Sequence, residues 1–218
     1  MKEQISRKTF EERIGARIPT ITGEINCVVP MKDIIEIAEI HLMPKPYLET
    51  LLRNVTLEGD QNCYPYRHAV IEYGRIDPHM LHIGQTFVER SKYQRLIESL
   101  SNLFEGFHSN QGFAKCTSLI VIGYTNEKKL VVAHYLTPLI EVHGRHNLID
   151  GVHRNYITRS IGTTIESITL REVACPPPCD FKDWNNVKVV EQKPPREERF
   201  KNLNTYYFRN LGWAGIDG

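Results

Sequence analysis

The order of apolar and polar segments after residue 138 constrains the fold more than any other part of the chain. A β-branched run at Leu139–Val142 predicts a strand, and a second short apolar run at 147–149 predicts another. A polar turn follows, then a helix-like stretch closed by Gly162 and a final apolar run at 165–173. The predicted order is therefore strand, strand, polar turn, helix, strand.

The polar turn reads Asp150-Gly151-Val152-His153-Arg154. A helix that begins at about Val152 leaves its first backbone N–H groups without intrahelical acceptors, and its positive dipole end favours an anion such as phosphate. Gly151 would let the backbone approach a phosphate without a Cβ in the way. Arg154 would offer a fork of donors, and His153 would add another donor that is stronger when protonated.

Structural roles compete with this interpretation. Asp150 is suited to holding a metal ion or orienting His153, and it is equally suited to capping the helix. His153 and Arg154 could instead be surface residues that pair with Asp150 or Glu166. The sequence favours the phosphate interpretation for the His-Arg pair and leaves the role of Asp150 open.

The remaining periodicities predict the other elements. Helical spacing of apolar residues predicts helices over Met31–Leu42 and Glu89–Phe104, and a short charged helix contains Phe10 and Ile14. Two β-branched runs, 119–122 and 130–133, flank a polar turn and predict a hairpin.

Composition narrows the class of protein. The chain has 218 residues, and an apolar content of 41% is enough for a sizeable core. Its net charge of +1 provides no overall field that would attract nucleic acid. The charged N-terminal residues lack the apolar core of a signal peptide, and no run approaches the ~20 apolar residues of a membrane span. We expect a soluble, cytoplasmic protein with no membrane partner.

These motifs together resemble the ParB/sulfiredoxin superfamily. The resemblance covers Arg67 to Val173. It rests on the strand, the Asp-Gly-x-His-Arg turn and the helix after it. The motif is most similar to those of the free serine kinases and the DGQHR proteins. It implies an α+β fold, with a mixed sheet and flanking helices at 63–179. A helical N-terminal extension at 1–62 and a C-terminal docking tail at 180–218 would lie outside that domain.

The resemblance also implies a nucleotide ligand, ATP, ADP or CTP with Mg²⁺. Its phosphates would be bound by Gly151, His153, Arg154 and Asn155. Asp150 would hold the metal ion and act in catalysis together with His153. The activity implied is hydrolysis or transfer of a phosphoryl group.

Two departures from the relatives limit this chemistry. Sulfiredoxins carry a reactive Cys directly before the His-Arg pair, and Val152 stands there instead, which argues against cysteine-sulfinate repair. The serine kinases place a catalytic Glu shortly before the first helix. In the corresponding stretch, 84–90, Glu89 is the only carboxylate and is therefore the third candidate catalytic residue.

The alternative function is nucleic-acid binding, or a nuclease-like activity, in a DNA-modification or mobile-element system. The C-terminal segment interleaves aromatic residues with arginines, a pattern that can stack the bases of DNA or RNA and contact their phosphates. The same side chains could simply pack on the protein surface, which we favour.

Two histidine pairs have the spacing of potential zinc ligands, His79 with His82 and His143 with His146. Neither has the additional Cys or Glu of a recognisable zinc motif. We favour loop histidines at both places.

Overall fold

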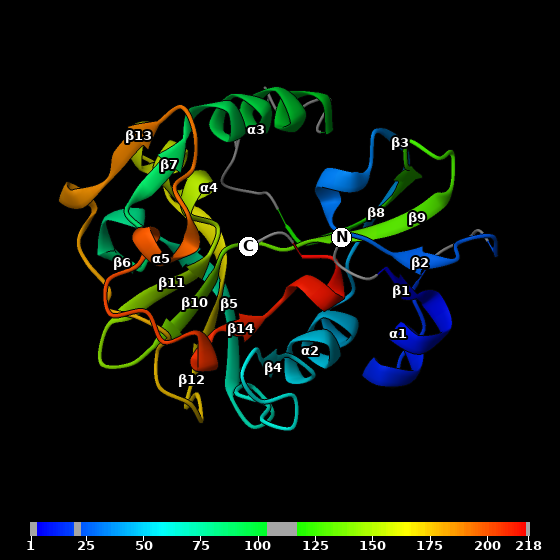
Figure 1. Ribbon diagram of the computed structural model, residues 1–218, viewed down its shortest axis with the longest axis horizontal. Helices are drawn as coiled ribbons and strands as arrows, with labels where there is room; N and C mark the ends of the chain where they lie inside the picture. Colours follow the sequence, from blue (N-terminus) through cyan, green and yellow to red (C-terminus); the bar gives the residue numbers. More distant parts are fainter. Residues whose placement is uncertain (1–3, 20–22, 104–116, 217–218) are drawn as a thin grey trace. The chain divides into compact units, whose positions relative to one another are not determined.

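The computed structural model describes residues 4–19, 23–103 and 117–216, and the side chains of 99–103 are not described. The chain forms two compact units (Figure 1). The first unit comprises Met1–His68, Thr117–Leu136 and Arg209–Gly218, and the second comprises Ala69–Cys116 and Thr137–Phe208. The sequence suggests three consecutive segments, whereas each unit combines separate stretches, because strands far apart in the chain pair with one another.

The first unit contains a mixed five-stranded sheet in the order β1-β2-β9-β8-β3. Its elements are β1 (Ile5–Ser6), α1 (Arg7–Ile14), β2 (Cys27–Val28), β3 (Glu36–Leu42), α2 (Lys45–Arg53), β4 (Thr56–Leu57), β8 (Leu119–Tyr124), β9 (Leu130–Tyr135) and β14 (Arg209–Asn210). The hairpin β8–β9 is confirmed, with Val121 opposite Ala133. Both of its strands are buried at their centres, which explains their continuous β-branched runs.

The predicted helix over Met31–Leu42 is wrong. Residues 36–42 form the edge strand β3, which pairs antiparallel with β8 from Glu36 opposite Tyr124 to Leu42 opposite Leu119. The apolar residues fit helical spacing by coincidence, and the exposed Ile37 and Leu42 show that no helix face is buried here. Pairing with the strongly apolar β8 overrides the local spacing.

The second unit contains the other five-stranded sheet, in the order β5-β12-β10-β11-β6. Its elements are β5 (Val70–Ile76), β6 (Leu81–Ile83), β7 (Phe87–Glu89), α3 (Arg90–Leu103), β10 (Leu139–Val142), β11 (His146–Asp150), α4 (Val152–Ser160), β12 (Ile165–Arg171), β13 (Lys188–Val190) and α5 (Arg196–Arg199). The sheet is mixed, since β10 pairs antiparallel with β11 but parallel with β12. The expected α+β class and the order strand, strand, turn, helix, strand are confirmed.

Helix α4 packs on one face of this sheet, beside α3 (Figure 1). The core joins side chains from the strands, from α4 and from the C-terminal segment: Leu81, Ile83, Val88, Ile140, Leu148, Val152 and Trp184. Tyr93 of α3 meets Tyr156 of α4 edge to face, with their ring centroids 6.2 Å apart. The amphipathic spacing predicted over 89–104 is confirmed as α3; Phe104 lies outside the described residues.

Within the described part of the chain, no helix is both long and apolar enough to cross a bilayer.

Candidate functional site

The turn between β11 and α4 is shaped by Gly151. Gly151 is the N-cap of α4 and has a φ of +96°, in the left-handed region that glycine tolerates best. A Cβ built there would lie 3.0 Å from Cβ of Pro138. The helix begins at Val152 as predicted, but the interpretation of Asp150 as N-cap is corrected. Because glycine has no side chain, no side-chain cap hydrogen bond serves the first N–H groups of α4.

Asp150 and Arg154 form a buried ion pair across the first turn of α4. Nη2 of Arg154 donates to Oδ2 of Asp150 at 3.1 Å, and both side chains are 8% exposed. A buried charge needs a partner, so this pair fixes the turn and lies beneath the surface, unlike the surface pairing considered from the sequence. The guanidinium of Arg154 thus already uses one of its donors within the protein.

His153 is also buried and receives a hydrogen bond. The backbone N–H of Glu89, at the end of β7, donates to its Nε2 at 3.1 Å, which requires an unprotonated Nε2. Burial first, and then the nearby charges of Lys92, Lys193 and Arg154, lower the pKa of His153 to about 3. His153, expected as a donor, is therefore an acceptor at Nε2, and this hydrogen bond joins the start of α3 to the start of α4.

Asn155 is fully buried. Its Nδ2 donates to the carbonyl oxygen of Gly151 at 3.0 Å, the same oxygen that accepts from its backbone N–H. The side chain is thus placed to hold the Gly151 turn in shape. The structure brings Glu89 and residues 150–155 together, as the sequence suggests, but their polar groups largely hydrogen-bond to one another.

Two partly buried lysines that the sequence analysis does not assign to the site, Lys92 and Lys193, are within electrostatic range of His153. Burial, followed by the charges of Lys92 and Arg199, lowers the pKa of Lys193 to about 8. Glu89 and Asp150 act on the same ammonium in the opposite direction. Lys193 therefore lies within electrostatic range of both helix starts, and we refer to Lys92, Lys193, Arg154 and Arg199 as the cation cluster.

The cation cluster carries four positive charges against the carboxylates of Glu89 and Asp150, leaving two in excess. The excess is local, because the whole chain carries only +1. The sequence offers one signal for it, three cations within seven residues around Pro194 and Pro195. That signal does not reveal which residues lie near these cations, because their position depends on the parallel pairing of β13 with β7.

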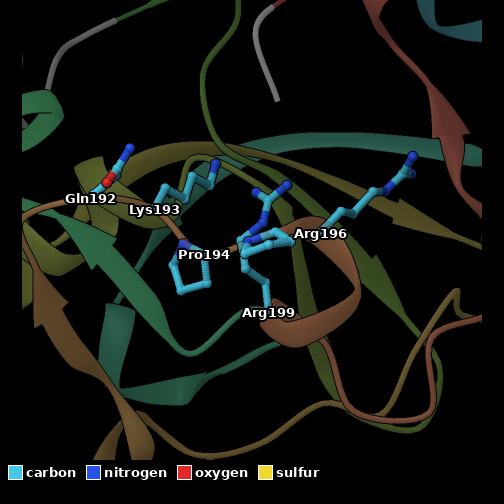
Figure 2. Close-up of a pocket in the computed structure, with 6 residues that line it drawn as sticks. Gln192, Lys193, Pro194, Arg196 and Arg199 are labelled. Carbon is cyan, nitrogen blue, oxygen red and sulfur yellow. The ribbon is translucent and has the colours of Figure 1, made fainter.

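An open pocket of about 640 Å³ adjoins the cation cluster. It is lined by Gln192, Lys193, Pro194, Pro195, Arg196 and Arg199. Figure 2 shows the side chains of Lys193 and Arg199 extending toward the same side of their segment.

The described residues do not form a metal site of their own. They contain no group of three or more His, Cys, Asp or Glu side chains placed to hold an ion. Asp150, the expected magnesium ligand, is bonded to Arg154. Magnesium held mainly through nucleotide phosphates needs only one or two protein carboxylates, so Mg²⁺ stays a prediction.

The candidate zinc histidines have other neighbours. His82 lies 3.3 Å from Asp183, and Nε2 of His143 lies 2.8 Å from Oε2 of the buried Glu141. These contacts account for two of the four imidazoles without a metal ion.

The aromatic side chains of the C-terminal segment mostly contact the protein itself. Trp184 lies in the core and donates from Nε1 to the carbonyl oxygen of Pro78 at 2.7 Å. The ring of Phe200 meets that of Phe208, with their centroids 5.2 Å apart, whereas Tyr206 is 46% exposed.

Comparison with protein-family models, with curated proteins and with solved structures finds no match. The resemblance to the ParB/sulfiredoxin superfamily therefore stays a prediction.

Proposed function

We propose that this protein binds the phosphate groups of a nucleotide at the start of α4 and hydrolyses or transfers a phosphoryl group. The observation that carries the proposal is the cation cluster around the Gly151 turn. Burial, and then the neighbouring like charges, lower the pKa of Lys193, and an anionic ligand would offset the repulsion between those charges. Perturbed titration of this kind is typical of functional sites.

The backbone of the turn supports the same conclusion. The first N–H groups of α4 carry no side-chain cap, and the positive end of the helix dipole adds to the charge of the lysines. Gly151 adopts the left-handed conformation at which β11 turns into α4, and Pro138 packs where a Cβ would lie. The buried pair of Asp150 and Arg154 and the neutral His153 hold the turn before any ligand arrives.

Glu89 is the carboxylate best suited to catalysis. It is only partly buried, and its Oε1 accepts a hydrogen bond from Ser91 at 2.8 Å. In the proposed reaction Glu89 accepts a proton from the attacking water or hydroxyl, and the bond between phosphorus and the leaving oxygen breaks. Lys92 and Lys193 offset the charge on the phosphoryl oxygens.

Calorimetric titration with ATP, ADP and CTP, with and without Mg²⁺, tests the binding. We expect saturable binding to the wild type and at least a tenfold weaker Kd for Lys193→Met, because a buried charge-assisted hydrogen bond contributes roughly 1.5–3 kcal/mol. Lys188→Met is the matched control, since exposed Lys188 precedes the site on β13. A folded wild type that binds none of the nucleotides would refute the proposal.

Phosphate release, or transfer to a co-substrate, tests the reaction separately. Glu89→Gln keeps the size of the side chain and removes the base, so we expect a loss in kcat of at least about 100-fold with a nearly unchanged Kd for nucleotide.

Nucleic-acid binding is the alternative, and it has weaker support. The packed rings of Trp184, Phe200 and Phe208 are committed to contacts within the protein. Salt-dependent retention of DNA or RNA by the wild type, without nucleotide binding, would favour it.

A further inference from the structure

The segment that follows β13 is fixed at both ends against the strand that leads into α3. Parallel pairing places Val190 opposite Glu89, and an isolated bridge joins Phe200 to Gln85. Residues 191–199, the connecting segment, therefore leave β7 at the end next to α3 and return to the residues that precede β7. Pro194 and Pro195 restrict its backbone, which reduces the entropy lost when a ligand binds.

Three cations of the connecting segment line its pocket: Lys193, Arg196 and Arg199. The guanidinium carbon of Arg196 lies 3.8 Å from the centre of the Phe208 ring, which positions this side chain.

Arg199 has donor capacity that the protein does not use. Its Nη1 is 3.4 Å from Oε1 of Gln85, a long hydrogen bond, and its buried Nε has no hydrogen-bond partner in the described part of the chain. Desolvation, followed by the charge of Arg196, lowers the pKa of the Arg199 guanidinium. A desolvated donor of this kind is stabilised by an anionic acceptor.

We propose that Lys193, Arg196 and Arg199 form a second anion subsite, adjacent to the first one at the start of α4, so that the ligand carries two or more linked phosphates. Pyrophosphate and nucleoside di- or triphosphates have this chemistry. The inference rests on the proposed function, and it goes further because it assigns the binding of a second phosphate to the connecting segment.

Compactness favours linked phosphates over a nucleic-acid backbone. Lys193 lines the pocket of the connecting segment and is within electrostatic range of both Lys92 and Arg199, so the two subsites share its ammonium. Two phosphates that share a bridging oxygen fit such an arrangement. Successive phosphates of a nucleic acid are separated by a whole sugar.

Titration with inorganic phosphate, pyrophosphate, ADP and ATP tests the second subsite. We expect the wild type to bind pyrophosphate at least about tenfold more tightly than phosphate. Arg199→Met should weaken the binding of pyrophosphate more than the binding of phosphate, and so reduce that ratio to about threefold or less. Arg75→Met, which removes an exposed arginine of β5, should behave like the wild type.

Folding of each variant is checked by circular dichroism and thermal melting. Arg199→Lys keeps the charge and removes the planar fork, so it should lose part of the preference for pyrophosphate. It replaces Arg199→Met in the comparison should that variant not fold.

The possible failures are distinguishable. Equal affinity for phosphate and pyrophosphate overturns the second subsite and leaves the proposed function standing. A folded wild type that binds neither anion and neither nucleotide overturns both. An oligonucleotide that binds more tightly than pyrophosphate, and loses affinity in Arg199→Met, overturns the linked-phosphate ligand and assigns the segment to a nucleic-acid backbone.

Discussion

At the scale of single residues, Lys193 shows most clearly how the proposed site would lose stability in exchange for binding. Its ammonium is half-buried among like charges, which costs folding free energy as long as no anion is present. Residues that destabilise a fold while serving its function are common at binding sites.

Replacing this lysine should therefore stabilise the protein and weaken the binding of phosphate. We predict that Lys193→Met raises the free energy of unfolding at pH 7 by roughly 1–3 kcal/mol, measured by urea denaturation. The folded pKa, about 8, is below the ordinary 10.5, so the cost is fully present below pH 8 and is relieved as the pH rises from 8 to 10.5. The difference between the two proteins should narrow over that range; a destabilised variant would contradict the account.

His153 should make the fold sensitive to acid. Its folded pKa of about 3 is below the ordinary 6.5, so between these values the unfolded state takes up a proton that the folded state does not. The stability is complete above pH 6.5 and is lost as the pH falls toward 3. His153→Gln keeps an acceptor for the Glu89 N–H but has no group that titrates in this range. Between pH 6.5 and 4, we predict that the free energy of unfolding falls by roughly 2–3 kcal/mol less in this variant than in the wild type.

Exposed His79 provides the control for that measurement. His79→Gln should follow the wild-type pH curve. A His153→Gln curve as steep as that of the wild type would show that the imidazole is not buried in its neutral form.

Sequence reasoning located the residues of the turn but not all their roles. The Asp-Gly-x-His-Arg spelling indicates a phosphate site, and the structure gathers these residues with Glu89. The motif does not reveal that His153 is an acceptor, because its donor is a backbone N–H that is 64 residues away in the chain. The position of Lys193 depends on the pairing of β13 with β7, which are even further apart in the chain.

At the scale of elements, the junction of β11 with α4 determines the shape of the site. Its left-handed glycine and the close approach of Pro138 leave no room for a side chain.

Gly151→Ala should be more costly than an equivalent change elsewhere. We predict a loss of roughly 2–4 kcal/mol, from the positive φ and from the clash with Pro138. Gly144→Ala is the control, because Gly144 also has a positive φ, of +73°, but a Cβ there meets no atom within 4 Å. It should lose only about 1 kcal/mol. Equal losses in the two variants, measured by thermal denaturation, would contradict the importance of the Pro138 contact.

Strong periodicity predicted the correct type of element, and ambiguous periodicity predicted the wrong one. The long helix α3 and the hairpin β8–β9 have unambiguous patterns. The stretch that forms β3 has apolar residues compatible with either period, so its pairing with β8 decided the outcome.

At the scale of the whole molecule, the proposed site belongs entirely to the second unit. The first unit has its own buried network, in which Nδ1 of His134 donates to the carbonyl oxygen of Ala214 at 2.6 Å. Its Nε2 therefore accepts from the hydroxyl of Tyr47 at 2.8 Å, and the ring of Phe10 stacks on the imidazole.

Tyr47→Phe should separate stability from binding. The change leaves Nε2 of His134 buried without its donor, which costs roughly 1–3 kcal/mol. All the residues of the proposed site lie in the other unit, so the Kd for pyrophosphate should stay within about twofold of the wild type. A loss of affinity as large as that of Lys193→Met would contradict the assignment of the site to the second unit.

The most direct test of the account is the pKa of Lys193 itself, with and without phosphate. After reductive methylation with ¹³C-formaldehyde, the signal assigned by its loss in Lys193→Met can be followed by NMR across pH 6–11. We predict a midpoint near pH 8 in the protein alone, rising by at least about one unit with saturating pyrophosphate, because the bound anion stabilises the charged ammonium. A midpoint near 10.5 in the protein alone, or one that pyrophosphate leaves unchanged, would contradict the claim that this lysine belongs to a phosphate site.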